Sequence, residues 1–252
     1  MRRRTIFNKK KVDWIKYFKI PKVIEFFRGE IPLNALAVYP VFCSQADLYK
    51  NKQFHVSMQE IAKLSGLKKT ETVSKAVESL NCKEFRPGDN KSITLLKVKK
   101  DKSQGRPRNF YKVGFVRSLM NKQKIFQDSS YKFLAGIVTS GIWAKLSPRA
   151  KALYMAMREF SKPDLPWRAE YGFLTCTDSG FADKHEAYNN KLEEYKNRQF
   201  DLCTNSLTFL CNAVGMSSSN IGRTALSELE EAHLVKRIED EKYRFMVFIK
   251  PY

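Results

Sequence analysis

The 252-residue sequence predicts an α+β fold, mainly α with small β wings, built as two similar domains in tandem. Three observations support this prediction. The order helix, helix, glycine turn, helix and β-hairpin occurs once in each half. The length is sufficient for two cores of about 100 to 125 residues each. Charge is uneven: residues 1–130 hold 29 Lys and Arg against 11 Asp and Glu, a balance of +18, whereas 131–252 hold 17 against 15, a balance of +2.

The first half contains a complete set of these elements. Hydrophobic periodicity and turn residues predict helices over 31–49, 58–65 and 69–80, then a hairpin with strands at 93–98 and 110–115. Pro40 is expected to kink the first helix, because proline removes a helical hydrogen bond. A helix–turn–helix followed by a basic hairpin is typical of a winged helix, whose second paired helix enters the DNA major groove while the hairpin reaches nearby phosphate.

The second half repeats this order in the same register. Gly66 and Leu67 of the first turn correspond to Gly215 and Met216 of the second, and the apolar positions of the following helices correspond as well. The predicted elements are a helix over 146–160, capped by Ser147 with Pro148 at its first position, a helix–turn–helix over 206–234, and two strands around a turn at 239–242. The sequence therefore predicts two winged helices in tandem.

Composition and length divide the rest of the chain. The predicted organisation is a basic and aromatic N-terminal arm (1–30), a first winged-helix domain (31–120), a linker (121–140), and a second winged-helix domain (141–252) with an insertion at 163–201. The insertion is too long for a simple loop. Its role is not evident from its residues.

The net charge of +20 indicates a polyanionic partner, and double-stranded DNA is the one that a winged helix fits. Lysine suits phosphate and guanine edges, while hydroxyl groups bind either bases or backbone. In the first half the candidate DNA-binding residues of the reading helix are Lys68, Lys69, Thr70, Thr72, Ser74 and Lys75. Those of the hairpin are Lys99, Lys100, Lys102, Arg106 and Arg108.

The second reading helix has hydrogen-bonding side chains but little charge. Its candidate DNA-binding residues are Ser218, Ser219, Asn220, Arg223 and Thr224. Such a helix suits base reading once the first domain supplies affinity, because phosphate contacts position a protein and base contacts specify the sequence. Glu228, Glu230 and Glu231 are expected to repel phosphate at its far end. A dimerising or partner-binding winged helix is the alternative.

Other classes of protein are disfavoured. The three histidines form no metal-binding pair and no phosphate-binding glycine loop is present, so we expect neither an enzyme, a metal nor a cofactor. No apolar run approaches the roughly 20 residues of a membrane span, and lysines follow the N-terminal arginines where a signal peptide would be apolar, which favours a cytoplasmic protein. None of the five cysteines forms a CxxC pair; we expect buried free thiols at Cys43, Cys82, Cys176, Cys203 and Cys211.

The sequence resembles the tandem winged-helix replication initiators of plasmids and mobile elements. The resemblance covers about residues 30–120 and 140–252, carried by "LNALAVYPVFCSQADLYKN", "MQEIAKLSGLKKTETVSKAVESL", "LSPRAKALYMAMREF" and "LCNAVGMSSSNIGRTALSELEEAHLVKRI". It implies binding to repeated sites at an origin, contact with host replication proteins and a homodimer formed through one winged helix. In many such initiators the second winged helix carries the stronger DNA-binding charge, whereas here the first does. Two alternatives remain: a transcriptional regulator with tandem winged helices, and a nucleic-acid-binding subunit of a larger nucleoprotein complex.

Overall fold

The computed structural model is a mixed α+β protein with several small antiparallel sheets, and about half of its described residues are helical. It describes residues 16–48, 53–82, 84–85, 93–101, 108–114, 130–161, 199–217, 219–238, 244–249 and 251. The N-terminal residues 1–15, the hairpin tip with Lys102 and Arg106, most of the predicted insertion, Cys176, Ser218 and the turn at 239–242 lie outside the described residues.

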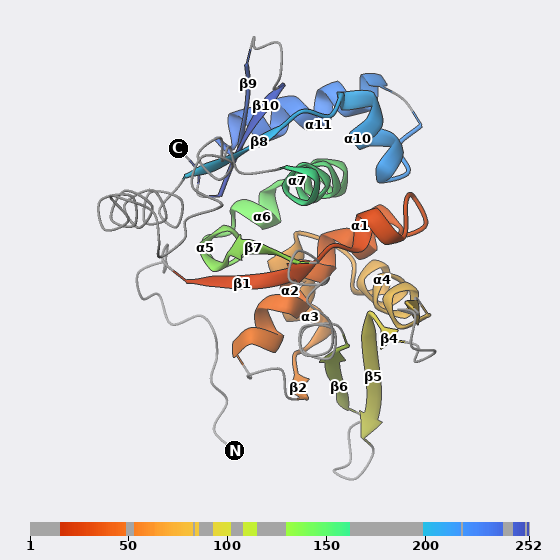
Figure 1. Ribbon diagram of the computed structural model, residues 1–252. Coiled ribbons are helices and arrows are strands. Elements are labelled where there is room, and N and C mark those ends of the chain that lie inside the picture. Colours follow the sequence, from red (N-terminus) through yellow and green to blue (C-terminus); the bar gives the residue numbers. More distant parts are fainter. Residues whose placement is uncertain are drawn as a thin grey trace, which may run out of the picture.

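The centre of the molecule is built from segments of both halves (Figure 1). Strand β1 (Tyr17–Pro21) pairs antiparallel with β7 (Ser130–Leu134), which places Lys19 opposite Lys132. The helices that follow are α1 (Val23–Phe26), α2 (Leu33–Leu48), α5 (Ala135–Thr139), α6 (Ile142–Lys145) and α7 (Pro148–Phe160). Helices α2 and α7 pack against each other and are buried over most of their length.

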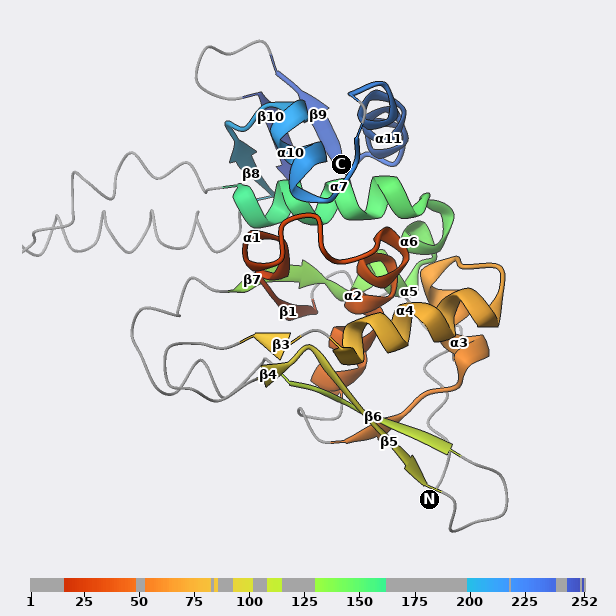
Figure 2. The ribbon, with the colours of Figure 1, turned by 90° about the vertical axis from the view of Figure 1, so that its right-hand side faces the viewer.

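One end of the molecule holds the first helix–hairpin unit, which consists of β2, α3, α4, β5 and β6 (Figures 1 and 2). Their bounds are β2 Phe54–His55, α3 Met58–Ser65, α4 Thr70–Cys82, β5 Leu96–Asp101 and β6 Arg108–Val113. The three strands form an antiparallel sheet in the order β2-β6-β5. A separate short ladder joins β3 (Glu84–Phe85) to β4 (Ile93–Thr94). The predicted first hairpin strand therefore begins three residues too early, because Ile93 and Thr94 belong to this separate ladder.

The opposite end holds the second helix–hairpin unit. Its elements are β8 (Phe200–Cys203), α10 (Leu207–Ala213), α11 (Ser219–Glu231), β9 (Val235–Arg237) and β10 (Phe245–Phe248). The strands form an antiparallel sheet in the order β8-β10-β9. In both units the strand before the helix pair lies beside the last strand of the hairpin. The two units therefore share both element order and strand order.

The same local signals start and end the helix pairs of both units. Ser57 Oγ accepts the backbone N–H of Glu60 to cap α3, and Ser206 Oγ accepts that of Phe209 to cap α10. The turns contain Gly66 at φ 70° and Gly215 at φ 74°. Glycine occupies this left-handed region without the steric penalty of a Cβ atom. Ser147 also caps α7, with Pro148 at its first position, as the sequence predicts.

The glycine turn of each unit packs against the centre of the molecule. Beside the first turn, a Cβ atom on Gly66 would lie 1.9 Å from the carbonyl oxygen of Ala144 in α6. Beside the second turn, Gly29 donates its N–H to Ala213 O at 2.9 Å. Each helix–turn–helix therefore contacts a segment from the other half of the sequence. Accordingly, the buried apolar side chains of the described residues form one continuous core.

The sequence predicts an arm over 1–30 and a linker over 121–140. In the structure, part of each range instead belongs to the folded centre of the molecule. Residues 17–26 form β1 and α1, with Phe18 and Ile20 buried, and residues 130–139 form β7 and α5. Phe18 and Phe133 pack in the core with ring centroids 5.3 Å apart. Each strand has only a short alternating pattern, and its partner is far away in the sequence. Pairing between such segments is not evident from either segment alone.

The prediction of buried thiols is confirmed at three positions and wrong at one. Cys43, Cys203 and Cys211 are buried and free, whereas Cys82 is exposed at the end of α4. The buried face of α4 includes Leu80, and a residue two positions further lies about 200° around a helix of 3.6 residues per turn. Cys82 therefore points away from the core.

Candidate nucleic-acid interface

Helix α4 presents a polar outer face because its apolar residues are turned inward. Val73, Ala76, Val77 and Leu80 are buried, and α4 packs on α2. Of the six residues predicted in and just before this helix, five are exposed and Thr72 is half-buried. Lys68, Lys69 and Thr70 lie together at the helix start, and Ser74 and Lys75 follow on the outer face. The fold therefore brings these predicted residues to one surface.

The charge of α4 itself is less positive than its lysine suggests. Lys75 Nζ lies 3.1 Å from Glu71 Oε1, with both side chains 75% exposed. Glu78 is also exposed on this helix. An exposed pair of this kind contributes little to stability but partly neutralises the lysine. Positive charge at this end thus comes from Lys68, Lys69 and the hairpin.

The β5–β6 hairpin separates its basic residues onto two faces. Residues alternate between the faces of a strand, and Leu96, Val98 and Tyr111 face the core. Lys99 is opposite Phe110 on the outer face. Lys100 is opposite Asn109 and follows the alternation of the inner face, at the end that extends beyond the core. Lys99 and Lys100, which the sequence groups together, therefore point in opposite directions; Arg108 is exposed and opposite Asp101 on the outer face.

Sequence reasoning missed two lysines of this hairpin. Lys97 and Lys112 are exposed and directly opposite each other on the outer face. Their alternation with the apolar residues of "LKVKK" and "FYKV" is visible in the sequence. Only the register between the strands, however, places the two side chains together. The prediction concentrated on the hairpin tip and so omitted both.

Helix α11 exposes three of the predicted residues of the second unit, namely Asn220, Arg223 and Thr224. Ser219 is the first residue of the helix. Arg223 Nη1 lies 3.4 Å from Asn220 Oδ1, and Thr224 Oγ1 donates to Asn220 O at 3.3 Å. The exposed amide, guanidinium and hydroxyl groups offer donors and an acceptor close together. These groups suit hydrogen bonding to base edges better than a purely electrostatic contact.

Two of the three glutamates near the end of α11 have partners, which weakens the predicted repulsion of phosphate. Arg237 donates to both carboxylate oxygens of Glu230, at 2.9 and 2.8 Å. Glu228 Oε2 accepts the backbone N–H of Ser147 at 2.9 Å and so fixes the start of α7. The sequence did not show that these carboxylates hold neighbouring elements.

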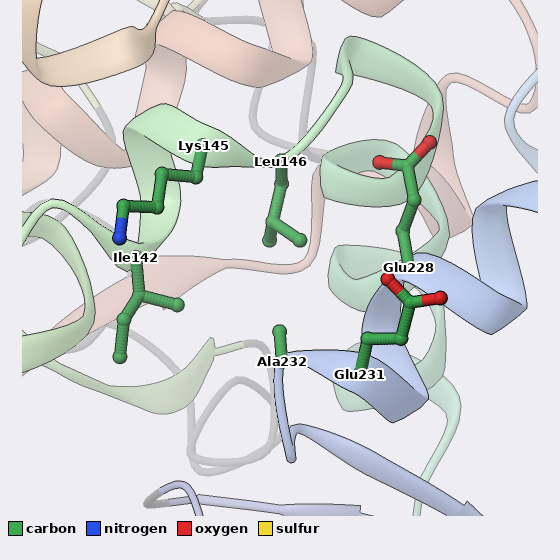
Figure 3. A pocket seen from close by; sticks show the side chains of 6 residues that line it. All are labelled: Ile142, Lys145, Leu146, Glu228, Glu231 and Ala232. Atoms are coloured by element: carbon green, nitrogen blue, oxygen red, sulfur yellow. The ribbon is translucent and has the colours of Figure 1, made fainter.

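A cavity of about 330 Å³ lies between α6 and the end of α11. It is lined by Ile142, Lys145, Leu146, Glu228, Glu231 and Ala232 (Figure 3). Beside it the buried Lys151 donates to Leu146 O, and burial lowers the pKa of this lysine to about 8 while Glu228 opposes the shift. Lys151 thus joins α7 to Leu146, which follows α6, and Glu228 joins α11 to the start of α7.

Three further buried ionisable groups, Arg158, Asp201 and Glu159, hold the centre together. Arg158 donates to Asp201 Oδ2 at 2.7 Å and to Lys132 O at 3.0 Å, which links α7 to β8 and β7. Glu159 accepts the N–H groups of Ile24 and Glu25, at 3.2 and 2.6 Å, at the start of α1. Burial raises the pKa of Glu159 to about 8 despite these hydrogen bonds. These groups are enclosed within the centre and have structural contacts.

Within the described part of the chain, no group of His, Cys, Asp and Glu side chains is arranged to hold a metal ion. In the same residues, no helix has both the length and the apolar composition required to cross a bilayer. Comparisons of the chain with protein-family models, curated proteins and solved structures gave no significant match.

Proposed function

We propose that the protein is a sequence-specific double-stranded DNA-binding protein in which the two helix–hairpin units act as tandem winged helices. The observation that carries this proposal is the repetition of one arrangement: strand, capped helix, glycine turn, polar-faced helix and hairpin, with the same strand order in both sheets. In winged helices, the second helix of the pair reads the major groove. Helices α4 and α11 occupy that position here.

The first unit supplies most of the affinity in this proposal. Lys68 and Lys69 lie beside the start of α4, and Lys100 lies on the inner side of the hairpin end. Backbone amides at the start of a helix also favour phosphate, so charge and dipole act in the same direction. Contacts of this kind are independent of sequence and set the position of the protein on DNA.

The second unit supplies base discrimination. Arg223 and Asn220 match groups that pair with guanine and adenine edges, and Thr224 adds a hydroxyl. Two of the nearby carboxylates are occupied, by Arg237 and by the backbone of Ser147. With this division, α11 can contribute base recognition although it carries little charge, because the first unit supplies the affinity for DNA.

Replication initiation in the cytoplasm is the role we infer for this binding, on the basis of the sequence resemblance. It requires repeated DNA sites, host replication proteins as partners and, in the dimeric form, a second copy of the chain. An array of direct repeats beside the gene would support initiation. A single palindrome overlapping the promoter would instead support transcriptional control.

We expect hairpin and helix substitutions to have different effects on DNA binding. Lys100→Ala should weaken binding equally on a duplex of the selected sequence and on a scrambled duplex, and should reduce the salt slope by about 1, because each phosphate contact contributes about 0.9. Thr70→Ala with Ser74→Ala should instead reduce discrimination between the two duplexes by about 1 to 3 kcal/mol. Fluorescence anisotropy over a range of salt concentrations measures both quantities.

Arg149→Ala is the matched control, because it removes an exposed positive charge from the central helix α7. It should leave the affinity within about twofold of the parent protein, since it lies outside the proposed contacts. Binding by the parent protein that is insensitive to salt would contradict the electrostatic part of the proposal. Identical behaviour of the hairpin and helix variants on both duplexes would contradict the role given to α4.

A further inference from the structure

The outer face of the β2-β6-β5 sheet combines exposed cations with aromatic rings. We define the outer sheet face by His55, Lys97, Lys99, Arg108, Phe110 and Lys112. The register places Lys97 opposite Lys112, Lys99 opposite Phe110, and His55 opposite Phe110 on the other side. Asp101 is the acidic residue of the same face and lies opposite Arg108 at its end. The inner face is covered by α2, since the ring centroids of Tyr111 and Phe42 lie 5.0 Å apart.

The lysine pair on this face is electrostatically unfavourable in the free protein. Directly opposite residues of an antiparallel pair have Cβ atoms about 4.5 to 5.5 Å apart, and like charges there destabilise the sheet. Among the described residues, no carboxylate forms an ion pair with Lys97, Lys99 or Lys112. A polyanion bound across the face would convert this repulsion into attraction.

The aromatic rings give the face a second kind of contact. The rings of His55 and Phe110 lie 5.7 Å apart between centroids, and Phe110 is half-buried. His55 Nδ1 lies 2.8 Å from Asn109 O, which fixes the orientation of its ring. A ring held beside cations on an open sheet suits an unstacked base whose phosphates contact the lysines. The bases of a duplex are stacked on each other and cannot offer such a face.

The corresponding face of the second sheet lacks this combination. There, Met246 lies opposite Lys236 of β9 and Leu202 of β8. Phe248 and Phe200 lie opposite each other on this face with ring centroids 5.6 Å apart, but Phe248 is buried, and the exposed Lys236 has Met246 rather than a second lysine opposite it. The outer sheet face is thus specific to the first unit, although the two units share their fold.

We propose that the outer sheet face binds single-stranded nucleic acid, with phosphates on the lysines and Arg108 and a base stacked on Phe110. This surface lies on the side of the sheet opposite to the covering helices, whereas the proposed duplex contacts involve α4 and the inner side of the hairpin. The inference therefore goes beyond the proposed duplex binding and does not depend on it.

The test compares labelled oligo(dT), oligo(rU) and a random-sequence duplex by fluorescence anisotropy at one salt concentration. Lys97→Ala with Lys112→Ala should weaken binding of the single strands by about tenfold and that of the duplex by less than about threefold. Phe110→Leu should weaken single-strand binding by about tenfold, whereas Phe110→Tyr, which keeps the stacking ring, should stay near the parent value. Circular dichroism melts establish that each variant is folded.

Arg149→Ala again controls for the loss of a positive charge and should leave single-strand binding unchanged. Tighter binding of one of the two oligonucleotides assigns the strand as DNA or RNA, and equal binding supports recognition through phosphates and stacking alone. Single-strand binding that is unaffected in the lysine variant would overturn the proposal, as would an equal loss on single strands and duplex. If the parent protein bound single strands but not the duplex, this result would support the single-strand inference and contradict the proposed function.

Discussion

Gly66→Ala is expected to lower the free energy of unfolding by about 3 kcal/mol or more, since it combines overpacking with a left-handed backbone. Gly66 has φ 70°, and a Cβ atom would lie 1.9 Å from Ala144 O and 2.7 Å from Ala144 C. These are backbone atoms of α6, so no side-chain rotation can relieve the contact. Either α6 or the whole α3–α4 turn must move. Urea unfolding followed by circular dichroism measures the change.

Two other glycines separate backbone strain from close packing. Gly141 has φ 87°, but a Cβ atom added there would have no neighbouring atom within 4 Å, so Gly141→Ala should cost only about 1 kcal/mol for the backbone alone. At Gly215 the nearest atom would be Gly29 O at 3.0 Å, which predicts an intermediate effect. Equal losses for Gly66→Ala and Gly141→Ala would contradict the contact between the first turn and α6.

Arg158→Met is expected to destabilise the protein by about 3 to 5 kcal/mol, because it breaks a buried ion pair by removing its cation. The side chains of Arg158 and Asp201 are only 2% and 6% exposed, with 2.7 Å between Nη1 and Oδ2. The substitution also removes the donor to Lys132 O, which ties α7 to the β1–β7 ladder. Thermal and urea unfolding should both show the loss.

The double variant Arg158→Met with Asp201→Leu should recover much of this stability, because it replaces both charges of the buried pair with apolar groups. Lys75→Ala provides the exposed comparison. Its ion pair with Glu71 is largely solvated, so the loss should be below about 1 kcal/mol. If Arg158→Met cost no more than Lys75→Ala, the buried pair would not be holding α7 to β8.

The sequence was sufficient to predict those features that depend on neighbouring residues. The helix pairs and the helix α7 follow from local apolar periodicity, and the start of α7 follows from Ser147 and Pro148. The left-handed turns follow from Gly66 and Gly215. In each case the residues that determine the element lie within one or two turns of it. Repetition of these signals strengthened the prediction of two similar units.

Features that depend on distant residues were not predictable in the same way. The β1–β7 pairing and the contact of Gly29 with the second turn join segments that carry no mutual signal in a single sequence. The candidate surface shows the same limit. Lys97 meets Lys112 only through the strand register, and Glu228 is directed to Ser147 only because α11 packs against α7.

The most direct test of the central claim, that α4 and α11 read one DNA site together, is selection from a random duplex pool followed by sequencing of the retained DNA. The parent protein should enrich a site with two blocks of preferred bases. Thr70→Ala with Ser74→Ala should relax one block, and Arg223→Ala the other, each by about 1 to 3 kcal/mol. A pool without any enriched sequence, or an Arg223→Ala protein with the base preference of the parent, would contradict the claim.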